Sequence, residues 1–424
     1  MSARPGARWR VFAWLSVAQT GAALGVGLTA FAVAVHILER SHSTLAFGVA
    51  SALGIVPSVL LAPAAGVLVD RWGATRALVV AGLSAAGCSA ALAALLATGS
   101  DAPVPIGLLL AATAACVALQ WPAWVKASTA LVEPAQLGRA SGWMQLGQAA
   151  QHVGSPAVAA LLLIQLPPWG VVVCDAGLAL ASAGVALALA LPPDPPARAL
   201  AFAQELAGGW RWIRERRPLW AWQWYFAASF GTGAFLMLLS RPLLLSMSGV
   251  EAMGGALTAG GLGMVVGAVA AGLWGGPRRR ATAILWIDGS ASVWMLLTAL
   301  APSPALVAVT CFLFLVQYAL ANSLHQAMWQ AQVPVEAQGR VFGVRRMVMW
   351  AGIPAGYVVA GAMSQWWDVR VVLALAAGAR GLGCVIGAAW VPALRQADHM
   401  ASAAGGVASA ADGVAASVGD AAID

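Results

Sequence analysis

The stretch that decides the fold is Gly66-Val67-Leu68-Val69-Asp70-Arg71-Trp72-Gly73-Ala74-Thr75-Arg76, a short charged segment between two long apolar blocks. Similar blocks recur along the chain, and each is long enough to cross a bilayer as a helix, which takes about 20 residues. Only 9% of the 424 residues are charged and the mean hydropathy is +0.81. Because a soluble chain carries about 25% charged residues, the composition predicts an all-α membrane protein.

Twelve apolar segments qualify as spans when the blocks are read in order. The first is too long for a signal peptide and lacks a cleavage site after it, so we expect it to be retained. We predict spans at residues 11–38, 45–69, 77–97, 103–125, 140–164, 171–191, 218–246, 252–275, 282–300, 304–325, 341–364 and 371–392.

The longest connection lies in the middle of the chain, at residues 192–217, and is rich first in proline and then in arginine. We therefore predict an N-terminal six-helix half over residues 1–191, a cytoplasmic linker over 192–217, a C-terminal six-helix half over 218–392 and a disordered cytoplasmic tail over 393–424. Trp210 and Ile213 share a face at helical spacing, so part of the linker is expected to form an amphipathic helix at the membrane surface.

The basic residues report orientation. If the N-terminus lies in the cytoplasm, 19 of the 23 Lys and Arg residues fall in cytoplasmic segments, as the positive-inside rule requires. This predicts an even number of spans with both termini cytoplasmic. The charges sit in short loops between apolar blocks, which argues against a nucleic-acid partner. The bias toward Arg over Lys suggests a GC-rich bacterial genome. The expected location is the inner (plasma) membrane.

Two short matches indicate that the halves are repeats. Ala64-Ala65-Gly66 recurs as Ala270-Ala271-Gly272, and Gly138-Arg139 recurs as Gly339-Arg340. The offsets are 206 and 201 residues, and both matches fall at corresponding places in the two predicted halves. Duplication of a six-helix unit, which is common in transporters, explains both matches.

The segment Gly66–Arg76 resembles the signature of the major facilitator superfamily: a glycine, then Asp-Arg, a glycine and a basic residue. Residues 121–162 and 332–342 resemble the bacterial macrolide-efflux and enterobactin-exporter-like members. The resemblance covers roughly residues 10–392 and implies two six-helix halves that alternate access to a central cavity. It also implies that the chain is an exporter and not an enzyme.

In that family the acid of the signature sits against the start of a helix from the other half, where unpaired amides and the helix dipole favour a carboxylate. The resemblance therefore implies a conformational latch. A charged turn between two helices is the alternative interpretation. The expected latch residues are Gly66, Asp70, Arg71, Gly73 and Arg76, with Arg139 and Arg340 at the facing helix starts.

Polar and aromatic side chains inside the spans are candidates for the cargo cavity, because each is costly in hydrocarbon. They recur at helical spacing in spans 4, 5, 7 and 10, and hydrogen bonding between helices is the alternative role. The candidate cavity residues are Gln145, Gln148, His152, Trp121, Trp124, Trp222, Tyr225, Tyr318 and Asn322.

Few acidic groups lie near the spans, and export against a gradient needs one that exchanges protons. The candidates for proton coupling are His36, Glu39 and Asp175, and Asp175 matches an acid of the resembled subfamily. Asp288 and Arg380 are instead predicted to form a structural ion pair. The sequence contains no nucleotide-binding motif, and the five dispersed cysteines predict neither a metal site nor a disulfide.

These features predict export of a small amphiphilic, macrolide-like compound, driven by the proton gradient. A siderophore exporter of the same fold is one alternative, and a polytopic membrane enzyme or a sensor is another. The expected partners are a small-molecule cargo, protons and the lipid bilayer; no cofactor is expected, and the protein is expected to be a monomer.

The arginine distribution generates a test of orientation. Reporter fusions after residues 74, 209 and 278 are expected to read cytoplasmic, and fusions after residues 100 and 302 periplasmic. Paired alkaline phosphatase and fluorescent-protein fusions measure both sides. A clear reversal at any one site would break the twelve-span assignment.

Overall fold

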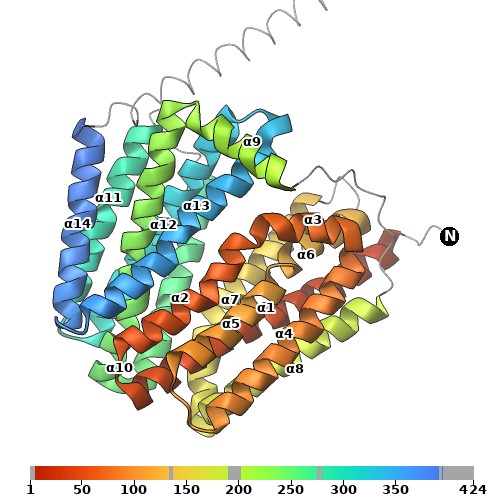
Figure 1. Cartoon of the computed structure of the whole chain (residues 1–424), viewed down its shortest axis with the longest axis horizontal. Helices are drawn as coiled ribbons and strands as arrows, with labels where there is room; N and C mark the ends of the chain where they lie inside the picture. The colour runs from red at the N-terminus through yellow and green to blue at the C-terminus, as the bar shows by residue number, and fades with distance from the viewer. Residues whose placement is uncertain are drawn as a thin grey trace, which may run out of the picture.

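The computed structural model describes residues 5–132, 137–189, 202–274, 277, 280–390 and 394. Every regular element in this part of the chain is an α-helix, and eight of these helices are long and apolar enough to cross a membrane. Figure 1 shows two helix bundles side by side, the N-terminal one red to yellow and the C-terminal one green to blue. The prediction of an all-helical membrane protein is confirmed.

The N-terminal bundle contains two spans that are broken in the middle. Leu61 separates the first pair of helices and follows Pro57, whose carbonyl accepts the Leu61 N–H at 2.8 Å. Pro122 lies in the first turn after the second break, where its missing N–H costs nothing. The helices are α1 (Pro5–Ser41), α2 (Thr44–Leu60), α3 (Ala62–Trp72), α4 (Ala74–Ala97), α5 (Pro103–Val117), α6 (Gln120–Leu131), α7 (Leu137–Gln165) and α8 (Pro168–Ala188).

The C-terminal bundle begins with a helix that doubles back on itself. It is followed by four further long helices, and a separate short helix precedes it in the chain. These elements are α9 (Phe202–Arg214), α10 (Arg217–Trp274), α11 (Arg280–Ala299), α12 (Pro304–Gln332), α13 (Val335–Met363) and α14 (Val369–Trp390).

The reversal in α10 occurs at Ser248 and Gly249, whose backbone angles are not helical, and Gly249 has φ of 76°. Gly233 and Gly263 both lie against the same turn of α12, beside Phe314 and Phe312 respectively. A straight helix would separate two such positions by about 45 Å, so the chain must turn back between them. Counting α10 as two passes and each broken span as one, the described helices make six passes in each half.

The linker contains helix α9, which lies at the end of the molecule where α10 begins (Figure 1). Ile213 is only 1% exposed, and the Trp210 ring packs edge-to-face on Trp220 with centroids 5.2 Å apart. Leu394 is also buried and packs into the same apolar cluster. The chain therefore remains part of the C-terminal bundle slightly beyond the predicted boundary at residue 392.

The two halves touch through α2 with α13 and through α7 with α10. Both contacts are too close to admit a side chain. A Cβ atom on Gly48 would lie 2.7 Å from the Tyr357 carbonyl oxygen, and one on Gly261 would lie 2.3 Å from the His152 carbonyl oxygen. The contacts run from the middle of these helices toward the end away from α9. We call this pair of contacts the far seam.

A leucine at Gly48 or Gly261 is expected to hold the far seam open, because the backbone opposite cannot give way. Overpacking of this kind costs about 1–3 kcal/mol. The measurement is the distance between spin labels at the exposed positions His42 and Gln365, which is expected to lengthen in each variant. Gly87→Leu is the matched control, since nothing lies within 4 Å of a Cβ there. An unchanged distance in both seam variants would contradict this account.

Candidate functional site in the transmembrane region

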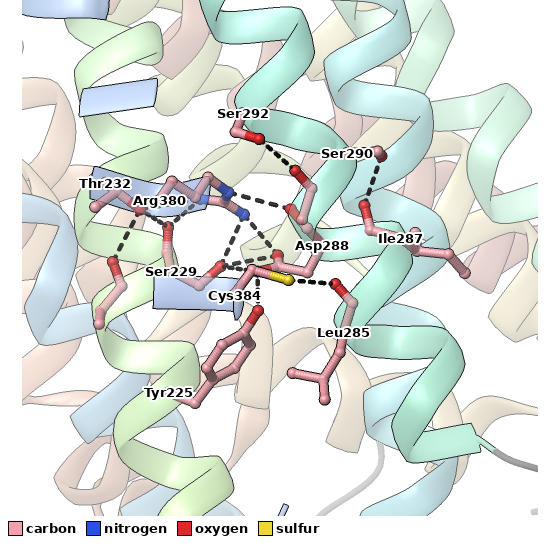
Figure 2. A network of polar contacts seen from close by, with 12 residues as sticks. Tyr225, Ser229, Thr232, Leu285, Ile287, Asp288, Ser290, Ser292, Arg380 and Cys384 are labelled. Atoms are coloured by element: carbon pink, nitrogen blue, oxygen red, sulfur yellow. Dashed lines mark hydrogen bonds and ion pairs between the residues drawn. The ribbon is translucent and has the colours of Figure 1, made fainter. Parts of the chain in front are cut away.

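A polar network joins three helices inside the C-terminal bundle (Figure 2). Asp288 of α11 forms a salt bridge with Arg380 of α14, with Nη2 and Oδ1 2.6 Å apart and both side chains nearly fully buried. From α10, the Tyr225 hydroxyl donates to Asp288 Oδ2 at 2.9 Å, and the Ser229 hydroxyl donates to Oδ1 at 2.9 Å. The acid and the cation that the sequence pairs are therefore in contact.

The guanidinium of Arg380 is satisfied on every side. It donates to the Ser229 carbonyl at 2.5 Å, to the Thr232 hydroxyl at 3.1 Å and to the Asp288 carbonyl at 3.3 Å. Removing one member of such a buried set leaves the others without partners, which is far more costly than the net value of any single bond. The network thus fixes α10, α11 and α14 to one another.

The cavity role expected of Trp222 and Tyr225 is not what their contacts indicate. Trp222 is completely buried and donates from Nε1 to the Leu394 carbonyl at 3.0 Å. Tyr225 points into the network around Asp288. Both therefore pack inside the C-terminal bundle. The helical spacing correctly put them on one face, but spacing alone does not tell which neighbour that face meets.

A second buried cluster lies near the α9 end of the same bundle and was not predicted. His325 of α12 is fully buried and stacks on Phe226 with ring centroids 3.6 Å apart. Trp329 donates from Nε1 to its Nε2 at 2.8 Å, and Arg345 Nη2 lies 2.8 Å from its Nδ1. The spacing of His325 and Trp329, one helical turn apart, was the available signal.

The N-terminal bundle holds a buried acid in an otherwise uncharged setting. Asp175 of α8 is 2% exposed, and its Oδ2 accepts from Thr29 of α1 at 2.7 Å and from Ser89 of α4 at 2.8 Å. No salt bridge to Asp175 occurs among the residues that the structure describes. Among the described residues, the hydrogen-bond partners of its carboxyl group are the two hydroxyls of Thr29 and Ser89.

The Asp175 cluster and the Asp288 network occupy corresponding places in the two halves. Thr29, Ser89 and Asp175 stand about 200 residues before Thr232, Asp288 and Arg380, as expected for a repeat. The same three helix positions therefore carry an acid with a cation in one half and an acid with hydroxyls in the other. The two halves thus carry polar clusters at matching positions, with a cation present in only one of the two clusters among the described residues.

The other two coupling candidates lie toward the far end of α1. His36 is buried, and its Nε2 is 2.8 Å from the Ser100 carbonyl oxygen, while Glu39 is exposed. His36 lies two helical turns, about 10 Å, from Thr29. Its contact ties α1 to the α4–α5 loop, so the structure does not bring these groups to Asp175.

The segment expected to form the latch is the junction of α3 and α4. Gly73 has φ of 82° and donates its N–H to the Val69 carbonyl at 2.9 Å, which ends α3. Arg71 and Arg76 are exposed, with the Arg76 guanidinium 5.9 Å from the Trp72 ring, and Gly66 is half-buried.

The side chains that would close this latch lie outside the described residues. This applies to Asp70 of α3 and to the two arginines at the facing helix starts, Arg139 of α7 and Arg340 of α13. The latch therefore stays a prediction.

The remaining cavity candidates are spread over three helices. The side chains of Gln145 and Gln148 lie outside the described residues, whereas His152, on the same helix, is exposed. Trp124 is buried and meets Trp121 edge-to-face at 5.8 Å. On α12, Tyr318 lies 5.5 Å from the Phe230 ring, and Asn322 is half-buried.

The described part of the chain shows no group of three or more His, Cys, Asp or Glu side chains that could hold a metal ion. Two helix bundles with buried polar clusters inside them and close backbone packing between them are the architecture expected of a secondary transporter. The sequence profile of the Major Facilitator Superfamily matches residues 15–331. The chain belongs to that superfamily, as its signature segment indicates.

Individual proteins that resemble this chain are consistent with its assignment to the superfamily. Macrolide efflux protein A of Streptococcus pyogenes is 25% identical over 354 residues, covering 77% of this chain and 83% of that protein. The Enterococcus faecalis protein of the same name is 26% identical over 332 residues, covering 72% and 97%. The crystal structure of the nucleoside transporter NupG has a TM-score of 0.70 at 14% identity and covers 89% of this chain and 98% of NupG.

The Asp288 network generates a test of packing. Asp288→Asn and Arg380→Gln are each expected to lower membrane abundance, because either charge alone in hydrocarbon costs about 2.5–3.5 kcal/mol. The double variant is expected to recover part of the loss. Quantitative immunoblotting of membranes and detergent melting curves measure the effect. Glu251→Gln, at an exposed acid, is the control; strictly additive losses would contradict the pairing.

Proposed function

We propose that this transporter exports a small amphiphilic, macrolide-like compound from the cytoplasm in exchange for protons. The arginine-rich loops and α9 face the cytoplasm, and the far seam faces the outside of the inner membrane. Two relatives named macrolide efflux protein A support the class of cargo. The observation that carries the coupling is the buried Asp175, which meets hydroxyl groups where its counterpart site in the other half has a salt bridge.

The proposed role of Asp175 follows from charge. A buried carboxylate with no cation is costly, and binding a proton removes that cost without rearranging the hydroxyls around it. Asp288 gains nothing from a proton, because Arg380 already neutralises it. Asp175 is thus the better of the two buried acids for taking up a proton from one side and releasing it to the other.

The α1–α8 interface offers polar groups beyond Asp175. Gln19 of α1 donates from Nε2 to the Ser182 hydroxyl of α8 at 2.9 Å, and both are buried. These residues lie two to three helical turns from Thr29 and Asp175 toward the α9 end. In the proposed mechanism, this interface carries the proton between Asp175 and the cytoplasmic side, while the rocking of the halves moves the cargo.

The test uses inverted membrane vesicles and a radiolabelled macrolide. Wild-type vesicles are expected to accumulate the macrolide when energised and to lose it when a protonophore is added at constant ATP. Asp175→Asn is expected to reduce gradient-driven accumulation at least tenfold, since a group that cannot exchange protons cannot couple. It is expected to keep cargo-for-cargo exchange, which needs no net proton movement.

Gly184→Ala is the control, because it alters the same helix at a position where an added Cβ meets nothing within 4 Å. Full gradient-driven accumulation by Asp175→Asn would exclude Asp175 as the coupling group but leave efflux intact. Accumulation that persists with the protonophore would reject proton coupling, and absence of macrolide transport by the wild type would reject the proposed cargo.

A further inference from the structure

A pocket of about 450 Å³ lies between the linker helix α9 and the α9-end half of α13. This volume is within the range of roughly 300–1,000 Å³ that is usual for small-ligand sites. It is separate from the Asp175 cluster, the Asp288 network and the far seam. The lining residues are Ala207, Trp210, Arg211, Arg214, Val344 and Met347.

Both walls of the pocket are formed by helices whose side chains pack into the protein. Val344 is 1% exposed on the α13 side, and Ile213 is equally buried beneath α9. Trp210 is braced by its edge-to-face contact with Trp220. The pocket is therefore formed by packed elements on both sides.

Both charged side chains among the described residues that line the pocket are cations. Arg211 and Arg214 are exposed in the last turn of α9, and the described residues that line the pocket include no acid. The neighbouring Arg216 is engaged elsewhere, because its guanidinium stacks 3.8 Å from the Trp212 ring centroid and donates to the Trp212 carbonyl at 2.9 Å. Two arginines thus remain available to a ligand at the rim of an apolar pocket.

We propose that this pocket binds one anionic phospholipid from the leaflet on the α9 side. Its phosphate group would be held by Arg211 and Arg214, and an acyl chain would lie between α9 and α13 against Val344 and Met347. Guanidinium groups bind phosphate through paired charge-assisted hydrogen bonds, and a basic amphipathic helix at the membrane surface places them at headgroup level.

The position of the pocket gives the lipid a role in transport. Helix α9 contacts both α13 of the C-terminal half and α3 of the N-terminal half. A lipid seated between α9 and α13 therefore fastens the linker to one half at the point where it touches the other. Transport is expected to depend on anionic lipid for this reason.

The test is native mass spectrometry of the delipidated full-length protein after exposure to vesicles of phosphatidylcholine with or without phosphatidylglycerol. The wild type is expected to retain one phosphatidylglycerol in preference to phosphatidylcholine. Arg211→Gln/Arg214→Gln is expected to weaken retention roughly thirtyfold, at about fivefold per charge near the surface. Arg216→Gln/Arg217→Gln removes the same charge outside the pocket and is expected to retain the lipid.

A second variant tests the pocket without changing charge. Ala207→Trp, at an exposed position of α9, fills the space and is expected to lose the bound lipid while α9 stays folded. Equal retention in the two arginine double variants would overturn the proposal, as would equal retention of phosphatidylcholine. Displacement of the lipid by inorganic phosphate or by a macrolide would assign the pocket to a free anion or to cargo and would equally overturn it.

Discussion

A polar group inside hydrocarbon has no water to bond with, and the rest of this structure depends on how the chain meets that constraint. Within each bundle, buried acids are enclosed by donors from two other helices. Asp288 receives bonds from α10 and α14, and Asp175 receives them from α1 and α4. Each cluster thus links three helices of its own half.

Among the described residues, the contacts between the halves are made by backbone packing instead of by hydrogen-bonded side chains. The far seam contains bare backbone surfaces at Gly48 and Gly261 rather than side-chain bonds. Close backbone packing of small residues holds helices together in membranes without committing polar groups. Such a contact can open without leaving a donor or acceptor exposed to lipid. Hydrogen bonds within the halves and close backbone packing between them are what a rocking transporter needs.

The sequence allowed the fold and one contact of the site to be predicted, for a clear reason. Apolar blocks of bilayer length leave few alternatives to a helix, and Asp288 and Arg380 are charges within those blocks that need each other. Trp222 and Tyr225 were placed on the correct face but beside the wrong neighbour, because periodicity does not identify what packs against a helix.

Other features of the structure could not be predicted from the sequence of this protein alone. The stacking of His325 on Phe226 joins residues about 100 positions apart, and no local pattern reports contacts at that range. The breaks at Leu61 and before Pro122 were signalled by proline, yet hydropathy runs through them without a change. The tight approach at the far seam was similarly hidden, since a glycine in a span can serve packing or nothing at all.

The reversal at Gly249 has a consequence for how the protein is made. Its two passes are joined by two non-helical residues, with no hydrophilic loop between them. Residues 217–274 would therefore reach the insertion machinery as one helical hairpin, without a hydrophilic loop that separates its two arms. Because this hairpin supplies Ser229 to the Asp288 network and Gly261 to the far seam, its entry into the bilayer would be the step at which the second half acquires its order and first meets the half already synthesised.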